Sequence, residues 1–213
     1  MSQPLTAVPA RMVAPEVPFA ARVLGWVLTL GGGIGALAAL TLIIERFNLL
    51  VDPTYRPTCS INPILSCGSV MTTSQAAVFG FPNPLIGVVG FSVVTTIGVA
   101  ALTGARLPRW FWLGLQAGAT LGVVFVHWLI YQSLYRIGAL CPYCMVVWVV
   151  TIVIFWYLTL HNLHHRHLPT PAVLRGAVTG LVRYHTVGLL LWFLVIAALV
   201  GEQFWFYWRT LLT

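Results

Sequence analysis

The chain has 213 residues, of which 59% are hydrophobic and only 7% are charged, with a mean hydropathy of +0.92. This composition lies far outside the averages of soluble domains and excludes an ordinary soluble fold. The net charge of +7 comes from eleven basic residues, all Arg, which are scattered singly between apolar runs. We therefore expect an all-α integral membrane protein whose charges set its orientation, and no nucleic-acid partner.

The N-terminal residues 1–22 contain four prolines and two arginines and show no apolar period, so they are expected to form a cytoplasmic tail. An uncharged run of 22 residues follows at 23–44. It is long enough to cross a hydrocarbon core about 30 Å thick, and too long for the apolar part of a signal peptide. The run contains Gly31, Gly32, Gly33 and Gly35, which either let a neighbouring helix approach closely or face lipid.

Residues 45–83 form a long polar connection that contains two cysteines, Cys59 and Cys67. Turn signals stand at Asp52-Pro53, Arg56-Pro57 and Asn62-Pro63. They predict that this loop folds back on itself. Residues 67–78 are expected to form a short helix that lies along the membrane surface or dips into it.

Four more apolar runs predict membrane-spanning helices, at 85–102, 110–135, 141–160 and 187–207. Between the last two, residues 161–185 are polar and partly amphipathic, and we expect them to form a cytoplasmic connector. The chain is thus divided into the tail, a four-helix catalytic domain over 23–160, the connector, and a fifth helix with the C-terminal end over 186–213.

The fourth span begins with Cys141-Pro142-Tyr143-Cys144. This Cys-x-x-Cys spacing puts both sulfurs near one face of a helix N-terminus, where unpaired N–H groups and the helix dipole stabilise a thiolate. A dithiol at the edge of the hydrocarbon layer can meet a soluble thiol on one side and a lipid-dissolved electron carrier on the other. We therefore expect a membrane thiol oxidoreductase. The rival interpretation is a zinc site, which the long gap between Cys59 and Cys67 disfavours.

The distribution of arginines predicts the orientation of a five-span chain. With the N-terminus inside, seven arginines lie on the cytoplasmic side, and four lie outside together with three of the four acidic residues. Both cysteine pairs and the C-terminus then lie on the extracytoplasmic face, where disulfides persist. The expected location is the inner (plasma) membrane.

The order of these motifs resembles the vitamin K epoxide reductase family. The resemblance rests on two outward cysteines in the first loop, a hydroxyl-rich segment after them, Asn83-Pro84-Leu85-Ile86-Gly87, and then a Cys-x-x-Cys that opens a helix. It covers roughly residues 23–160. The DsbB family has a similar architecture but puts its Cys-x-x-Cys before its loop pair. Many bacterial members carry a C-terminal thioredoxin-like domain, whereas no cysteine follows Cys144 here, so the redox partner is expected to be a separate polypeptide.

Bacterial members of that family oxidise a secreted thioredoxin-like protein of the DsbA type and pass the electrons to a quinone. The resemblance implies that Cys59 forms the mixed disulfide with this partner and that Cys67 passes the electrons to Cys141. Cys144 would then face the quinone, a menaquinone or ubiquinone. The spacing of the loop pair also permits a Cys59–Cys67 disulfide. The alternative is a quinone or vitamin K epoxide reductase, whose main product is the reduced quinone.

Recognition of a quinone requires hydrogen-bond donors within an otherwise apolar pocket. Asn83 matches the family's quinone-binding asparagine, and Thr73 stands where the family usually has serine. Vertebrate reductases have a tyrosine that helps bind vitamin K four residues after the last cysteine, where this chain has Trp148. This departure favours a plain quinone. Asn83 can instead cap the turn before Pro84, and the hydroxyl of Thr73 can satisfy a helix end.

The histidines have two interpretations each. His127, in the third span, either assists the quinone reaction or is a neutral residue hydrogen-bonded to a neighbouring helix. A second group consists of His161, His164, His165 and His167. Its spacing suits a metal ion, but a solvated helix end explains it more simply, and no metal site is expected.

The third functional class is a non-catalytic membrane scaffold with structural disulfides.

Overall fold

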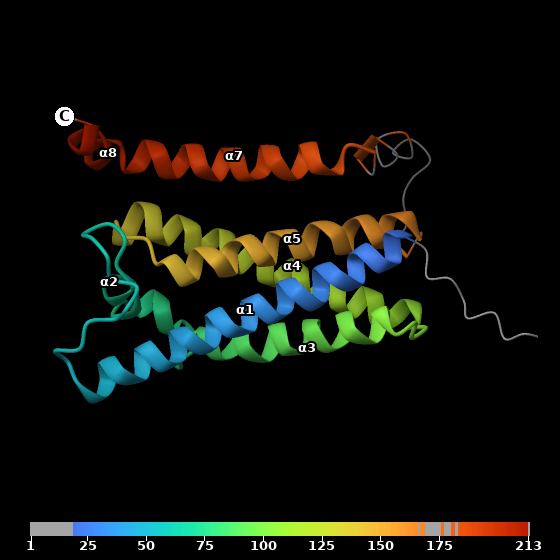
Figure 1. Cartoon of the computed structure of the whole chain (residues 1–213), viewed down its shortest axis with the longest axis horizontal. Helices are drawn as coiled ribbons and strands as arrows, with labels where there is room; N and C mark the ends of the chain where they lie inside the picture. Colours follow the sequence, from blue (N-terminus) through green and yellow to red (C-terminus); the bar gives the residue numbers. More distant parts are fainter. Residues whose placement is uncertain (1–18, 166, 169–175, 177–179, 182, 213) are drawn as a thin grey trace, which may run out of the picture.

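The computed structural model describes residues 19–165, 167–168, 176, 180–181 and 183–212, and within them every regular element is a helix (Figure 1). The long helices are α1 (Phe19–Val51), α3 (Pro84–Leu102), α4 (Arg109–Gln132), α5 (Pro142–His164) and α7 (His185–Gln203). The shorter ones are α2 (Cys67–Met71), the 3₁₀ turn η1 (Ser74–Ala77), the π-helical turn η2 (Ser133–Ile137) and α8 (Trp205–Leu212). The all-α prediction is confirmed. Most of the predicted tail, and part of the connector, lie outside the described residues.

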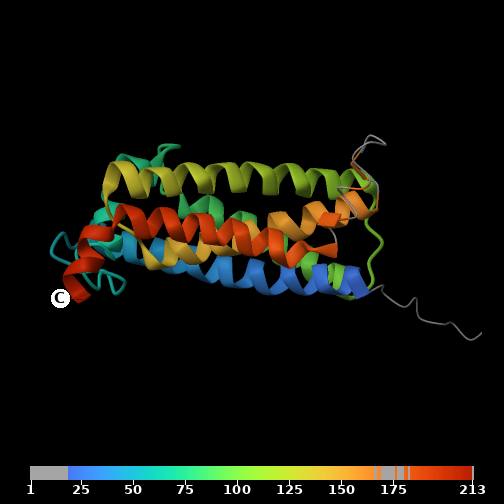
Figure 2. The same cartoon turned by 90° about the horizontal axis from the view of Figure 1, so that it is seen from above.

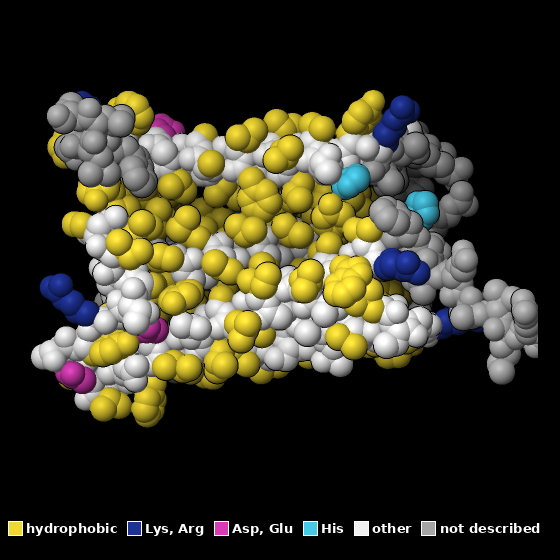
Figure 3. Space-filling view, in the orientation of Figure 1, with side chains coloured by type: hydrophobic (Ala, Val, Ile, Leu, Met, Phe, Trp, Pro, Cys, Tyr) yellow, Lys and Arg dark blue, Asp and Glu magenta, His cyan; other side chains and the backbone are white. Residues whose placement is uncertain are grey.

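Five helices of the described chain are long and apolar enough to cross a membrane. On the face shown in Figure 3, charged and histidine side chains gather near the two ends, and the band between them is largely hydrophobic. The chain is therefore a membrane protein with five apolar helices, as expected. The end that carries α2 and the start of α5 is called the cysteine end below. The opposite end, where α5 finishes, is called the histidine end (Figure 1).

Prolines and one left-handed glycine set several helix boundaries. Pro84 and Pro142 each occupy the first turn of a helix, where an N–H group would have no partner within the helix. Gly138 follows η2 with a φ of 69°, a conformation that side chains with a Cβ adopt reluctantly. The predicted spans 85–102 and 141–160 accordingly correspond to α3 and α5.

The first helix is longer than the sequence suggested. The prediction ended the span at residue 44 and began the loop at Glu45, because Glu45 and Arg46 are charged. The helix continues to Val51 and stops where Asp52-Pro53 begins. The start of the loop is therefore corrected to Asp52, and Glu45 and Arg46 belong to the last turns of α1.

Two other predicted helices are each divided in two. The segment 67–78 forms α2 and then η1, because the chain turns at Thr72 and Thr73. The fifth span, predicted over 187–207, is interrupted at Phe204, which separates α7 from α8. Phe204 is only 6% exposed and belongs to a hydrophobic cluster at the cysteine end. Burial of this side chain accompanies the break.

Helices α1 and α3 pack closely through glycines. A Cβ added at Gly32 would lie 2.8 Å from the backbone nitrogen of Thr95, and one at Gly98 would lie 2.5 Å from that of Thr29. Such distances require that no side chain be present. Gly33, by contrast, has open space around it. The close-approach interpretation thus holds for Gly32, and the lipid-facing one fits Gly33.

Helix α7 lies beside α4 and α5 (Figures 1 and 2). Trp192 on α7 donates its indole N–H to Nε2 of His127 at 3.0 Å. The other ring nitrogen of His127 lies 2.7 Å from the carbonyl oxygen of Val123, so it carries the proton in this arrangement. Trp156 on α5 also donates to the carbonyl oxygen of His185, at 3.1 Å. His127 is therefore the hydrogen-bonded histidine of the second interpretation, and it ties the fifth helix to the bundle.

Buried polar side chains join α4 and α5 at the histidine end. Asn162 is fully buried and donates to Oε1 of Gln116 at 3.0 Å. Gln116 in turn donates to the hydroxyl of Thr159 at 3.0 Å. The carbonyl oxygen of the Asn162 side chain lies 3.0 Å from Nδ1 of His167, which follows α5. These groups satisfy one another, and we refer to them as the Asn162 network.

Candidate active site

The two loop cysteines form a disulfide that touches a third cysteine. The Cα atoms of Cys59 and Cys67 lie 5.6 Å apart across the bond. The sulfur of Cys67 lies 2.9 Å from that of Cys141, a residue 74 positions away in the chain. Cys59 is 5% exposed, and the other two are fully buried. Attack of one sulfur on a neighbouring disulfide requires such contact.

A short backbone bridge holds Cys67 beside Cys141. The residues just before the two cysteines, Ser66 and Leu140, form hydrogen bonds between their chain segments. The N–H of Ser66 donates to the carbonyl oxygen of Leu140 at 2.9 Å, and the N–H of Leu140 donates to that of Ile64 at 2.7 Å. The register of this bridge, and not the side chains alone, brings the two sulfurs together.

Cys141 is the N-cap residue of α5. Its sulfur accepts a hydrogen bond from the backbone N–H of Cys144 at 3.5 Å. The unpaired N–H groups and the dipole at this helix N-terminus stabilise negative charge on a cysteine sulfur. Cys141 and Cys144 are both free thiols, so the inner pair is reduced while the loop pair is oxidised.

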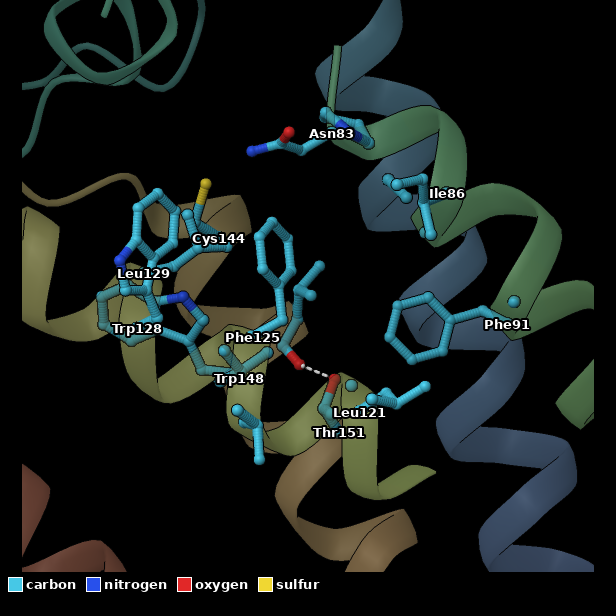
Figure 4. A pocket seen from close by; sticks show the side chains of 18 of the residues that line it. Asn83, Ile86, Phe91, Leu121, Phe125, Trp128, Leu129, Cys144, Trp148 and Thr151 are labelled. Carbon is cyan, nitrogen blue, oxygen red and sulfur yellow. Dashed lines mark hydrogen bonds between the residues drawn. The ribbon is translucent and has the colours of Figure 1, made fainter. Parts of the chain in front are cut away.

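Cys144 lies one helical turn further on and lines a cavity of about 1230 Å³ among α1, α3, α4 and α5 (Figure 4). The lining is overwhelmingly apolar and extends along the helices to Trp110 and Phe111. This volume exceeds the ~300–1,000 Å³ that is usual for small-molecule sites, and it can hold both a ring and an attached hydrocarbon chain. The cavity brings Cys144 next to the space that a lipid-soluble ligand would occupy.

Asn83 and Thr73 also line this cavity, and Figure 4 shows the Asn83 amide at the same end as Cys144. The amide of Asn83 donates to the carbonyl oxygen of Gln75 at 2.7 Å and accepts from the N–H of Val78 at 3.1 Å. One N–H of this amide is left for a ligand. The hydroxyl of Thr73 donates to the carbonyl oxygen of Val70 at 2.7 Å, so only its lone pairs face other partners. Both residues have the structural bonds that the alternative interpretation expected.

The sequence prediction treats Trp148 only as a departure from the tyrosine of the vertebrate reductases, but its indole is also a polar group of the site. It is 4% exposed, lines the cavity, and is the only residue of the described chain with a buried side-chain nitrogen or oxygen that lacks a hydrogen-bond partner. A buried N–H without a partner costs about 1–3 kcal/mol, which a ligand oxygen can recover. The indole of Trp148 therefore fits a carbonyl-bearing ligand beside Cys144.

The last turns of α1 hold the cysteine loop from two sides. Glu45 is 4% exposed, and its carboxylate accepts hydrogen bonds from the hydroxyl of Tyr55 and from the N–H and hydroxyl of Thr58. Its neighbour Arg46 donates to the carbonyl oxygen of Met71 at the end of α2. The sequence prediction places both residues in the loop and misses this role. The signal that could have found it is the adjacent pair of opposite charges directly after the apolar run, where the helix can continue.

Potential metal ligands gather at one place in the described chain. The sulfurs of Cys59, Cys67 and Cys141 all lie within 4.8 Å of one another. Two of them are joined in a disulfide, and a disulfide sulfur does not offer the thiolate that zinc requires. The arrangement therefore suits sulfur exchange better than metal binding.

The rings of the four histidines at the histidine end lie against one another in tilted, edge-on and stacked pairs. The ring centroids of His161 and His165 are 4.4 Å apart, and those of His165 and His167 are 5.8 Å apart. Burial lowers the pKa of His165, and repulsion from His164 and His167 lowers it further. These rings lie at the far end of the bundle from the cysteines.

Comparison with known families agrees with the site. The family model for the vitamin K epoxide reductase family matches residues 26–159, well over half of the chain. No curated protein matches the chain. The matched range contains all four cysteines, the cavity and the last turns of α1, and it ends before α7.

Proposed function

Since this chain belongs to the vitamin K epoxide reductase family of membrane thiol oxidoreductases, we propose that it oxidises a secreted thioredoxin-like dithiol protein of the DsbA type and passes the electrons to a quinone. We assign the reaction to residues 23–160. The observation that carries the proposal is the 2.9 Å contact between Cys67 and Cys141, which links an oxidised pair to a reduced one. A structural disulfide would have no need of a free thiol in contact with it.

The first half of the reaction takes place at the loop. A thiolate of the partner attacks Cys59, the Cys59–Cys67 bond breaks, and Cys67 leaves as a thiolate. The second thiol of the partner then displaces Cys59. The partner gains a disulfide, and the loop pair keeps the two electrons as thiols.

The second half transfers these electrons to the inner pair. With Cys141 and Cys144 joined, the Cys67 thiolate attacks Cys141 and Cys144 leaves as a thiolate beside the cavity. Cys59 then attacks Cys67 and releases Cys141, which gives the arrangement observed here, with the loop oxidised and the inner pair reduced. The quinone then accepts two electrons and two protons from the thiols of Cys141 and Cys144, and the inner disulfide forms again.

The cavity supports quinone as the acceptor class. Asn83 and Trp148 are assigned as the donors to quinone oxygens, and Thr73 as a lining group near the ring. The apolar remainder of the cavity suits a polyprenyl tail, as in menaquinone or ubiquinone. Trp148 in place of a phenolic donor favours the plain quinone over the epoxide.

The orientation follows from the charges. We place the N-terminus in the cytoplasm of a cell with the protein in its plasma membrane, and the cysteine end and C-terminus outside. The arginines assigned to the inner side are Arg11, Arg22, Arg106, Arg109, Arg166, Arg175 and Arg183, and those assigned to the outer side are Arg46, Arg56, Arg136 and Arg209. This orientation exposes the loop pair to secreted proteins.

The test mixes the purified protein with a reduced thioredoxin-like protein and either menaquinone or ubiquinone. We expect one quinone to be reduced for every two partner thiols lost, and alanine at any of the four cysteines should stop this reaction. In the Cys67→Ala variant Cys59 is a lone thiol, and its thiolate should attack the disulfide of the oxidised partner and trap that partner as a mixed disulfide, with the partner's other sulfur leaving as a thiolate. Loss of partner thiols without quinone reduction would refute the proposal.

The same chemistry also suits an enzyme whose main product is the reduced quinone. The oxidation state of secreted proteins in cells that carry the Cys144→Ala variant distinguishes the two functions. Unoxidised secreted proteins in those cells support the disulfide-forming role, whereas normally oxidised secreted proteins support the reductase role.

A further inference from the structure

The two halves of the cysteine loop are attached to the helices in different ways. The Cys67 arm, residues 61–71, is joined to the segment before α5 through Ile64 and Ser66, and to α1 through Arg46. The Cys59 arm, residues 53–60, has no such backbone bridge within the described chain. Among the residues that the structure describes, its hydrogen bonds to the long helices all end on the carboxylate of Glu45.

Glu45 is an unusual group for this position. Its carboxylate is almost completely buried, and no Arg of the described chain forms an ion pair with it. A buried carboxylate is unfavourable unless strong donors surround it. Tyr55 and Thr58 supply these donors, so the burial of the Glu45 carboxylate and the closed position of the Cys59 arm support each other.

The closed position conflicts with the reaction at Cys59. A protein thiolate must approach the sulfur of Cys59 along the disulfide axis, yet Cys59 is only 5% exposed. One arm must therefore move outward before the partner reacts. Cys67 is held by the backbone bridge to the Cys141 segment, so the arm that can move while the relay contact is kept is the Cys59 arm.

We propose that Glu45 is the positioning residue that holds the Cys59 arm closed during electron transfer to Cys141, and that release of this arm exposes Cys59 to the partner. This inference rests on the proposed function. In the closed state Cys59 is placed to attack a Cys67–Cys141 disulfide and to release Cys141. In the open state Cys59 accepts the thiolate of the partner and Cys67 leaves.

The first experiment measures opening with a small thiol. In full-length protein with Cys141→Ser and Cys144→Ser, only the loop pair remains, and glutathione reduces it at a rate that can be followed directly. Loss of the charged acceptor in Glu45→Gln should raise this rate about tenfold. Tyr55→Phe, which removes one donor and keeps the carboxylate, should raise it about threefold.

Asp52→Asn is the matched control. Asp52 is an exposed acid in the same loop, and its carboxylate bonds only to Thr54 within its own turn. Glutathione should reduce this variant at the parent rate. An unchanged rate in both Glu45→Gln and Tyr55→Phe, or an equal rise in Asp52→Asn, would overturn the proposal.

The second experiment measures how well the closed arm places Cys59 against Cys67. Its readout is the ratio of two disulfide forms, which a general loss of structure would not shift toward the Cys67–Cys141 form. In a Cys144→Ser protein one disulfide is shared among three cysteines, either as Cys59–Cys67 or as Cys67–Cys141. Attack of the Cys141 thiolate on Cys67 releases Cys59 as a thiolate, so the two forms interconvert without any added oxidant. Glu45→Gln should shift the population toward Cys67–Cys141 by about tenfold, whereas an unchanged ratio would contradict the role of Glu45.

Neither experiment contains a quinone or a protein partner. Failure of the proposed quinone reaction would therefore leave these two results standing, and failure of these results would leave the quinone reaction standing. Thermal unfolding of each variant identifies a protein that has not folded. In that case Tyr55→Phe, the milder change, decides the outcome.

Discussion

The two ends of the helix bundle both bury polar groups, but they use them differently. At the histidine end, the Asn162 network consists of side chains that donate to and accept from one another. At the cysteine end, the buried carboxylate of Glu45 on α1 is bonded to the loop that follows this helix, and one buried donor of the described chain, the indole N–H of Trp148, has no partner. A satisfied network fixes helices in place, whereas an unsatisfied donor beside a reactive thiol indicates a ligand.

This contrast assigns structure to one end and chemistry to the other. Polar residues inside a membrane are functional candidates by default, and this rule applies equally to Gln116, His127 and Trp148. Their hydrogen bonds separate them. Gln116 and His127 are paired across helices, while Trp148 lines the cavity beside Cys144. The following substitutions test this division.

The largest effect is expected at Cys144. Cys144→Ala removes the thiol that faces the cavity, so the inner pair can no longer form its disulfide. Quinone-dependent oxidation of the partner should fall by about a thousandfold or more, as for other nucleophiles that act as a unit. Stopped-flow measurements of the quinone absorbance give the rate that checks this prediction. Glutathione should still reduce the one disulfide that the variant retains, and substantial quinone reduction by the variant would contradict the assignment.

A substitution at the histidine end should reduce stability and leave catalysis intact. Asn162→Ala removes the side-chain partner of Oε1 of Gln116 and of Nδ1 of His167, which should cost about 1–2 kcal/mol. Thermal unfolding in detergent should register the loss. The kcat with saturating quinone should stay within a factor of two of the parent. A large fall in kcat in a folded Asn162→Ala protein would break the division between the two ends.

Trp148→Phe should act on quinone binding alone. The ring is kept, so packing changes little, but the buried N–H that lacks a partner in the described chain is lost. The KM for quinone should rise by about two- to tenfold with little change in kcat, which corresponds to one neutral hydrogen bond. Trp26→Phe, an exposed indole away from the cavity, is the control. Equal effects of the two substitutions would contradict the role of Trp148.

The smallest effect is expected where the fifth helix joins the bundle. Trp192→Phe removes the bond to His127 and should cost about 0.6 kcal/mol, the average for hydrogen bonds between membrane helices. The unfolding temperature should fall slightly, and turnover should be unchanged. Loss of turnover would mean that His127 takes part in the reaction after all.

The sequence was sufficient for the features that local patterns determine. Apolar runs of the right length located all five long helices, because the bilayer imposes that length. The order of the cysteine pairs led to the correct family. Pro84 and Pro142 marked helix starts because a proline has no N–H to lose there.

The features that failed depend on contacts distant in sequence. Glu45 was assigned to the loop because a charge normally marks the membrane boundary, but donors from Tyr55 and Thr58 satisfy it inside a longer helix. The break at Phe204 has no proline or turn signal, and it accompanies burial of that side chain against distant residues. The bridge at Leu65 and Leu140 likewise joins segments that no local pattern pairs.

The contact between Cys67 and Cys141 is tested most directly by cross-linking within one molecule. A protein with Cys59→Ser and Cys144→Ser keeps only these two thiols, whose sulfurs lie 2.9 Å apart. Mild oxidation should join them almost completely within the monomer, and peptide mapping by mass spectrometry should identify the Cys67–Cys141 bond. Two thiols that stay free under these conditions, or that link only between molecules, would contradict the relay.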